Sequence, residues 1–132
     1  ARRYPMMRYP WDRTEAALRA MADHGNGAMP ELDYVNPETG ADVLPTMGFT
    51  AMMLAAGMTT TPPRRSCSSA FHVVRGRGRT TIDGQTVEWG PKDTFSAPVF
   101  ASLSHEADEE AFLVRIHDRP LQEKLGYYEE RE

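Results

Sequence analysis

The sequence predicts an all-β domain, and three observations support that prediction. Apolar and polar residues alternate over short runs, at 71–74, 79–82 and 111–117, as they do in strands with one buried face. Asp83-Gly84 separates two alternating runs, and this pair is typical of a tight hairpin turn, because both central residues need a positive φ. Gly90-Pro91-Lys92-Asp93 marks a further turn.

Length and composition fit one globular domain. The chain has 132 residues, of which 40% are hydrophobic and 26% charged. No run approaches the ~20 apolar residues of a membrane helix. The net charge of −4 argues against a nucleic-acid partner. One cysteine, Cys67, excludes an internal disulfide and fits a reducing compartment, so we expect a cytoplasmic protein with no membrane partner.

The N-terminal part predicts a linker followed by a helix. Residues 1–11 are basic, aromatic and interrupted by two prolines, which disfavour regular structure. Residues 12–22 carry apolar side chains at one-face helical spacing. Asp12 and Glu15 resemble a capping box at the start of this helix, and Gly25 is a stop signal beyond its end.

Two strands are expected next, at 31–36 and 46–56. The second is apolar on both faces, so both faces must be covered. One face belongs to the core. The helix over 12–22 covers the other, or a second domain or subunit does; the sequence leaves both open. One face carries Met47, Phe49, Ala51, Met53 and Ala55, and the other carries Met52 and Leu54.

The stretch 59–69 is polar, basic and contains prolines, as a loop would. Its Arg64 and Arg65 are either solvated loop charges or contacts for an anion such as a carboxylate. Cys67 is expected to be a buried or half-buried filler without a lowered thiol pKa.

Three arginines alternate with glycines at 75–79. Such a run occurs in nucleic-acid-binding segments, but no aromatic residues interleave with it and the chain is acidic. Because no helix follows the Gly-x-Gly, it does not predict a dinucleotide loop either. These arginines are therefore expected to flank a hairpin turn.

The C-terminal part predicts a strand, a short helix and a tail. Over 111–117, Phe112, Val114 and Ile116 form an apolar face. Asp118 can cap a helix that ends before Gly126. Residues 127–132, two tyrosines followed by a mostly acidic run, are expected to form a solvated tail unless another chain covers them.

The glycine, proline and aspartate spacing of 57–105 resembles the two-part signature of the cupin barrel. Wider blocks from about Tyr9 to Gly126 resemble the C-terminal cupin of the gentisate 1,2-dioxygenase family, which includes salicylate and 1-hydroxy-2-naphthoate dioxygenases. The resemblance implies a cupin domain at 12–132, a double-stranded β-helix with a jelly-roll-like barrel and a short helix near each end. It also implies that the chain is the C-terminal half of a bicupin. The blocks are YPWDRTEAAL, YVNPETG, FHVVRGRGRTTI, EWGPKD and DRPLQEKLG, and the scaffold positions are Gly57, Gly76, Gly90, Asp93 and Pro98.

The four metal-ligand positions that the resemblance implies carry other residues. Pro63 and Arg65 stand at the His-x-His positions, Ser69 at the glutamate and Leu103 at the last histidine. Proline and leucine have no ligating side chain, and arginine is permanently cationic. We therefore expect no metal and no catalytic residue in this domain, which alone should not open a ring.

The histidines do not form a metal motif. The sequence has no His-x-His or Glu-x-x-His pair. His72 is expected to be a packed, hydrogen-bonded strand residue. His105 lies two residues beyond Leu103, on the same strand face, and could point into the barrel mouth. Possible contacts for an anion are Arg64, Arg65, His72 and His105.

Three functions remain open. In the first, the domain packs against an N-terminal cupin of the same protein, which holds Fe(II) for cleavage of a hydroxylated aromatic acid, and it builds the oligomer. In the second, it is a free-standing module that binds a small organic anion through Arg64 and Arg65. The chain begins without Met, consistent with a piece of a longer protein. A third possibility, residual side chains recruiting a metal at the barrel mouth, would make it an enzyme.

The strand at 46–56 also predicts self-association. The helix over 12–22 spans about 16 Å, so it would leave the Met52–Leu54 surface exposed as an interface. A two-fold dimer is the commonest closed arrangement. Replacing Leu54 with a charged residue should then weaken the dimer and leave the barrel folded.

Overall fold

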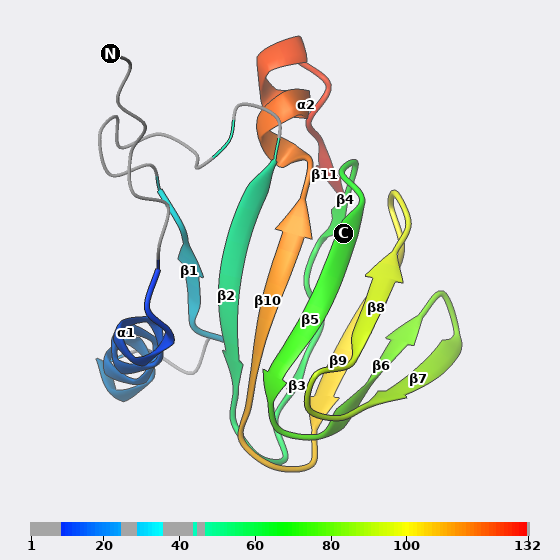
Figure 1. Ribbon diagram of the computed structural model, residues 1–132. Coiled ribbons are helices and arrows are strands. Elements are labelled where there is room, and N and C mark those ends of the chain that lie inside the picture. Colours follow the sequence, from blue (N-terminus) through cyan, green and yellow to red (C-terminus); the bar gives the residue numbers. More distant parts are fainter. Residues whose placement is uncertain (1–8, 25–28, 36–43, 45–46, 132) are drawn as a thin grey trace, which may run out of the picture.

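The computed structural model describes residues 9–24, 29–35, 44 and 47–131. In this part of the chain two sheets face each other, with one helix beside them and a second at one end (Figure 1). The elements are α1 (Trp11–His24), β1 (Glu31–Asp33), β2 (Gly48–Leu54), β3 (Thr59–Thr60), β4 (Arg64–Arg65), β5 (Ser69–Arg75), β6 (Gly78–Ile82), β7 (Gln85–Trp89), β8 (Thr94–Ala97), β9 (Leu103–Ala107), β10 (Ala111–His117), α2 (Arg119–Leu125) and β11 (Glu130–Arg131).

Every strand pair is antiparallel. The larger sheet has the order β1-β2-β10-β5-β8, and the smaller sheet has the order β3-β9-β6-β7. A two-stranded piece, β4-β11, lies near α2 (Figure 1). The all-β class with a short helix near each end is confirmed.

The turns form where the sequence predicts them. Asp83 and Gly84 have φ values of 48° and 86°, as a type I′ turn requires. The hairpin has only these two residues in its loop, since Ile82 pairs with Gln85. At the next turn the backbone N–H of Gly90 donates to the Asp93 carboxylate at 2.8 Å.

Strand β2 is covered on both faces, but the predicted faces are exchanged. Met52 and Leu54 are 2% and 0% exposed and belong to the core between the sheets. Ala51 and Met53 pack in a second cluster around Leu18 of α1. Cover by the helix is thus confirmed, and the predicted interface at Met52–Leu54 is wrong. Alternation separates two faces of a strand but does not say which one lies inside.

The same exchange occurs on β10. Its inward residues are Ala111, Leu113, Arg115 and His117, all buried. Phe112 packs under α1 instead, and Val114 and Ile116 are half-buried. The predicted apolar face therefore lies outside the barrel, because α1 and the remaining outer surface take up its apolar side chains.

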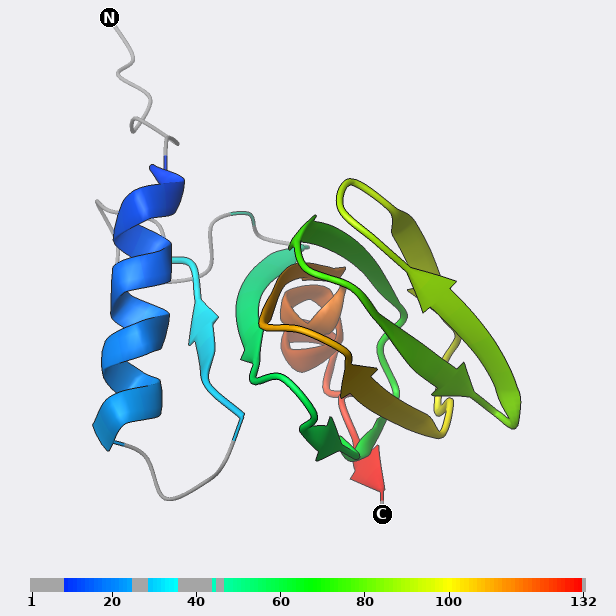
Figure 2. The same cartoon turned by 90° about the horizontal axis from the view of Figure 1, so that it is seen from below.

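Helix α1 begins one residue earlier than predicted and ends at His24. The Trp11 ring, expected in the linker, packs edge-on against Phe112 with centroids 5.5 Å apart. The predicted capping box is not formed: Asp12 lies inside the first turn, and Glu15 pairs with Arg75 of β5. Figure 2 shows α1 alongside β1, at one side of the sheets. The expected stop at Gly25 lies outside the described residues.

The C-terminal helix ends as predicted, at Gly126, whose φ of 76° is left-handed. Asp118 does not cap it: its carboxylate accepts from the backbone N–H of Ser68 at 3.0 Å. The tail is not simply solvated either. Strand β11 pairs with β4, and the backbone N–H of Glu129 donates to the Ser66 hydroxyl at 2.8 Å. The C-terminus thereby fixes the strand that carries Arg65.

The space between the sheets has two chemically different ends. Along β10, the buried apolar residues Ala111 and Leu113 come first, and Arg115 and His117 follow next to α2. Strand β2 shows the same change from apolar to polar residues. Its Leu54 and Met52 pair with Ala111 and Leu113, and its Thr50 pairs with Arg115. We call these the apolar end and the α2 end.

Candidate functional site

The four substituted ligand positions meet in one small cavity at the α2 end. Pro63, Arg65, Ser69 and Leu103 all line it, although they come from three separate stretches of chain. The cavity has a volume of about 10 Å³, which is room for about one water molecule. The remaining wall residues are Cys67, Ala97, Pro98 and Ala101.

This donor set does not fit Fe(II). That ion takes imidazole and carboxylate ligands and keeps open positions for substrates. The cavity offers a guanidinium, a hydroxyl and a thiol in their place. Within the described residues, no group of three or more His, Cys, Asp or Glu side chains could hold a metal ion.

Arg115 is the residue that sequence reasoning missed. It is 3% exposed, and its Nη1 donates to the Ser69 hydroxyl at 3.3 Å. Burial lowers the pKa of Arg115, and the charge of Arg65 lowers it further. The sequence holds one signal that Arg115 is buried: it shares a strand face with Leu113 and His117. Alternation with the apolar face of Phe112, Val114 and Ile116 nevertheless assigned the Arg115 face to solvent.

His105 lies inside the barrel and is fully buried. The Trp89 indole N–H donates to the Thr80 hydroxyl oxygen at 3.0 Å, and His105 Nδ1 lies 2.8 Å from the same oxygen. Burial first, then the charges of Arg65 and Arg115, lower the pKa of His105 to about 4. The imidazole is therefore neutral at pH 7.

Cys67 is a buried filler, as predicted. Burial raises the pKa of its thiol, although the charges of Arg115 and Arg65 oppose the shift. The thiol is thus protonated at neutral pH and offers no thiolate to a metal or an electrophile.

The four candidate anion contacts do not come together. Arg65 and His105 lie at the α2 end of the interior. Arg64 is exposed, and its Nε donates to the backbone carbonyl of Phe100 at 3.0 Å. His72 is hydrogen-bonded, as predicted, with Nδ1 3.0 Å from the Thr94 hydroxyl, but it lies on the outer face of β5.

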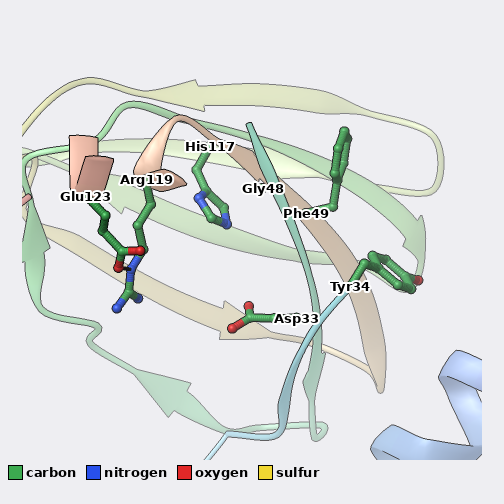
Figure 3. Close-up of a pocket in the computed structure, with 7 residues that line it drawn as sticks. All are labelled: Asp33, Tyr34, Gly48, Phe49, His117, Arg119 and Glu123. Atoms are coloured by element: carbon green, nitrogen blue, oxygen red, sulfur yellow. Dashed lines mark hydrogen bonds and ion pairs between the residues drawn. The ribbon is translucent and has the colours of Figure 1, made fainter. Parts of the chain in front are cut away.

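A second pocket lies beside α2, with a volume of about 140 Å³. Figure 3 shows Asp33, His117, Arg119 and Glu123 on one side of β2, with the rings of Tyr34 and Phe49 on the other. Gly48 leaves room for the His117 ring, since a Cβ at this position would collide with the ring.

Two groups that line this second pocket, Asp33 and His117, are joined by a short chain of hydrogen bonds through Thr50. The Thr50 hydroxyl donates to Asp33 at 2.6 Å, so His117 Nε2–H donates to the same hydroxyl oxygen at 3.0 Å. Burial and the charge of Arg115 lower the pKa of His117 to about 4. The chain joins β1, β2 and β10, and the pocket is smaller than the ~300 Å³ typical of ligand sites.

Two of the three arginines at 75–79 form ion pairs within the fold. Arg75 pairs with Glu15 of α1, and Arg79 pairs with Glu106 and Asp108 at 3.0 Å each. No helix of the described residues is long and apolar enough to cross a membrane.

Comparison with known proteins gives consistent relatives. The chain is 38% identical to a gentisate 1,2-dioxygenase from Ralstonia sp, covering 98% of this chain and 38% of that protein. It is 35% identical to a 5-aminosalicylate 1,2-dioxygenase from Comamonas sp, covering 97% and 36% respectively. The salicylate 1,2-dioxygenase of Pseudaminobacter salicylatoxidans superposes with a TM-score of 0.85 at 30% identity, covering 93% of this chain and 38% of that one.

No protein-family model matches the sequence. The chain spans a little over a third of the length of these relatives. The order of its strands, the two facing sheets and the superposition together confirm the predicted cupin fold. The chain therefore has the cupin fold and is similar over nearly its whole length to one part of the gentisate and salicylate dioxygenases, which is consistent with the C-terminal cupin of those proteins.

Proposed function

We propose that this domain is the metal-free C-terminal cupin of a gentisate 1,2-dioxygenase-like ring-cleaving enzyme, with a structural and oligomerising role. The observation that carries the proposal is the cavity at the ligand positions, where Arg65 stands in place of a histidine. A guanidinium repels a divalent cation, and Pro63 and Leu103 have no donor atom.

The partner in this proposal is an N-terminal cupin of the same protein. The relatives are longer dioxygenases, of which this chain spans only about 36–38%. Fe(II) would reside in that other cupin, where it would bind the aromatic acid and O₂ and supply the ring-opening chemistry. This domain would then contribute to the degradation of aromatic compounds in the cytoplasm without touching the substrate.

A packing surface for that partner lies across the α2 ends of β10, β5 and β8. A shallow groove of about 410 Å³ crosses it. Met47 is 39% exposed there, while Ile116 and Ala70 are half-buried and α1 does not reach them. Apolar surface of this kind marks interfaces. This groove replaces Met52–Leu54 as the expected contact surface.

The free-standing anion-binding module is the weaker function. It needs Arg64 and Arg65 to hold one organic anion together, yet Arg64 is exposed and bonded to Phe100. The cavity beside Arg65 has room for about one water molecule, which is too small for an organic acid.

Iron content and activity test the proposal directly. The purified chain is incubated with excess Fe(II), desalted and analysed for iron, and then assayed for loss of gentisate under air. We expect less than stoichiometric iron and no ring cleavage. One tightly held iron per chain, or ring cleavage by the chain alone, would overturn the proposal. The full reading frame should encode a His-x-His cupin upstream.

A substitution in the groove tests the structural role. Ile116→Glu places a charge among the half-buried apolar residues of the groove, so it should weaken association with the upstream cupin or with a second copy. Leu125→Glu, at a 57% exposed site on α2, is the matched control. Sedimentation of the wild type and of both variants reports the result. An unchanged assembly in Ile116→Glu with retained folding would exclude this surface.

A further inference from the structure

The α2 end of the barrel interior holds two cations and no buried carboxylate. Arg65 is half-buried and lines the small cavity. Arg115 is 3% exposed and is hydrogen-bonded to Ser69 of the cavity wall. Every buried polar residue of the described chain is a Thr, Ser, His or Arg; none is an Asp or Glu. A buried charge without a partner is strongly unfavourable.

Little negative charge lies close to these two arginines in the described part of the chain: Glu31 of β1 raises the pKa of Arg115 but forms no ion pair with it. The thiol of Cys67 is protonated, because burial raises its pKa. Burial also raises the pKa of Tyr128 to about 12, so this nearby phenol is neutral. Among the described residues, no ion pair joins a carboxylate to Arg65 or Arg115.

Three buried nitrogen atoms of Arg65, Arg115 and the neighbouring His105 have no hydrogen-bond partner. They are Nε of Arg65, Nε of Arg115 and Nε2 of His105. The Thr80 hydroxyl oxygen accepts from Trp89 and lies next to His105 Nδ1. In the tautomer in which this hydroxyl donates to Nδ1, the single imidazole proton lies on Nε2, which is then a donor.

The three donors lie on three different strands, β4, β9 and β10, which the fold brings together. Arg65 lines the cavity directly. Arg115 reaches its wall through the hydrogen bond to Ser69 and a contact with the Cys67 thiol. His105 is close enough for both guanidinium charges to act on its imidazole.

We propose that a single small inorganic anion of about the size of chloride binds in this cavity, between Arg65 and Arg115 and near His105. Its charge would compensate the two guanidinium groups, and its lone pairs would accept from the orphaned donors. The cavity volume restricts the ligand to a monatomic or similarly small ion. This inference concerns the chain's own residues and goes beyond the proposed structural role.

Thermal unfolding tests the proposal in solution. The purified chain is measured in sodium chloride and in sodium gluconate at equal ionic strength, so that general screening is constant. Binding to the folded state alone raises Tm with ligand concentration. We expect Tm to be several degrees higher in chloride and to saturate. Equal Tm values in the two salts across the whole concentration range would overturn the proposal.

Variants locate the effect. Arg115→Met and Arg65→Met each remove one cation at similar side-chain length, and both should abolish the chloride-specific rise. Arg64→Met is the matched control, since it removes the exposed neighbour and should retain the rise. If the chloride-specific rise in Tm persists in both Arg115→Met and Arg65→Met, or is lost only in Arg64→Met, the ion binds elsewhere and the proposal is wrong.

Bromide gives a direct readout that does not depend on any variant folding. In crystals of the wild-type chain grown or soaked in bromide, anomalous scattering should show one peak between the Arg65 and Arg115 side chains. A water molecule there, with no anomalous peak, would refute the proposal. Iron at the same place would refute both this proposal and the metal-free role. If only the proposed groove interface proves wrong, the anion proposal is unaffected.

Discussion

The two ends of the barrel interior use the same strands for opposite purposes. At the apolar end, Met52, Leu54 and Leu113 are at most 2% exposed and pack in one cluster. At the α2 end, the same strands carry Thr50, Arg115 and His117, which are also buried but depend on hydrogen bonds. One strand pair therefore serves both a hydrophobic core and a polar interior.

The difference shows where stability comes from. Apolar burial is favourable in itself, at roughly 25 cal/mol per Å². A buried polar group only recovers what its desolvation costs, and an unpaired one recovers less. The α2 end thus retains polar groups that a structural core does not need. This end lies where the family resemblance implies a metal site. Its charged groups are arginines, which are cations, whereas the ligands of such a metal site are neutral imidazoles and an anionic carboxylate.

The largest expected effect lies at the apolar end. Leu113→Ala removes a fully buried side chain and leaves a cavity between the sheets. It should lower the free energy of unfolding by about 2–5 kcal/mol. Leu125→Ala, at an exposed site, should change it by less than about 0.5 kcal/mol. Urea denaturation of both variants measures this, and equal losses would contradict the assignment of the core.

The two histidines of the α2 end predict a loss of stability in acid. Their pKa values in the folded chain are about 4, below the usual 6.5, so the unfolded chain binds more protons between these values. Stability is therefore complete above about pH 6.5 and falls as the pH drops towards 4, by about 2–4 kcal/mol at pH 5.

Urea denaturation at pH 7, 6 and 5 measures this slope. In His105→Asn one of the two histidines no longer titrates, so the slope between pH 7 and 5 should be shallower than in the wild type. His72→Asn, on the outer face of β5, is the control and should leave the slope unchanged. A wild-type free energy that is flat over this range would mean that the folded and unfolded chains bind protons alike, so that burial does not lower the histidine pKa values.

A smaller effect is expected where a single hydroxyl serves two neighbours. Thr80→Val keeps the shape of the side chain but leaves the Trp89 N–H and His105 Nδ1 without partners. It should cost about 1–3 kcal/mol. Thr81→Val, on the opposite face of the same strand, should cost less than about 0.5 kcal/mol. If both valine variants unfold at the same urea concentration, the bonds of Thr80 contribute nothing.

The smallest effect is expected for a cation at the surface. Arg79 is 37% exposed and pairs with Glu106 and Asp108. Arg79→Met should cost less than about 1 kcal/mol, because water screens these pairs. Comparing its unfolding with that of Arg115→Met separates the effect of position from that of charge. A loss as large as that of Leu113→Ala would show that the surface network dominates.

The sequence predicts the turns and the positions of the strands in this domain better than it predicts which strand faces point inward. Asp83-Gly84 requires a positive φ at both positions, so the residues themselves dictate the hairpin. Strand β2 is apolar on both sides, and nothing local decides whether Met52 or Met53 points inward. That choice depends on α1, which lies far away in the sequence and covers one face.

The sequence brought four residues of one cavity together but missed a buried arginine next to it. The family spacing places Pro63, Arg65, Ser69 and Leu103 at the ligand positions, and these residues do line one cavity. Arg115 was not predictable, since a charged residue in an amphipathic strand is expected at the surface. Only the register of β10 against β2 and β5 shows that it lies inside.

Strand β10 lies between β2 and β5 in the larger sheet (Figure 1). During synthesis, β2 leaves the ribosome about 60 residues before β10 is complete, which corresponds to several seconds at about 5–20 residues per second. For this time β2 lacks its main pairing partner and exposes apolar side chains on both faces. The nascent chain is then most vulnerable to aggregation, and a binding chaperone would meet residues 48–54 first.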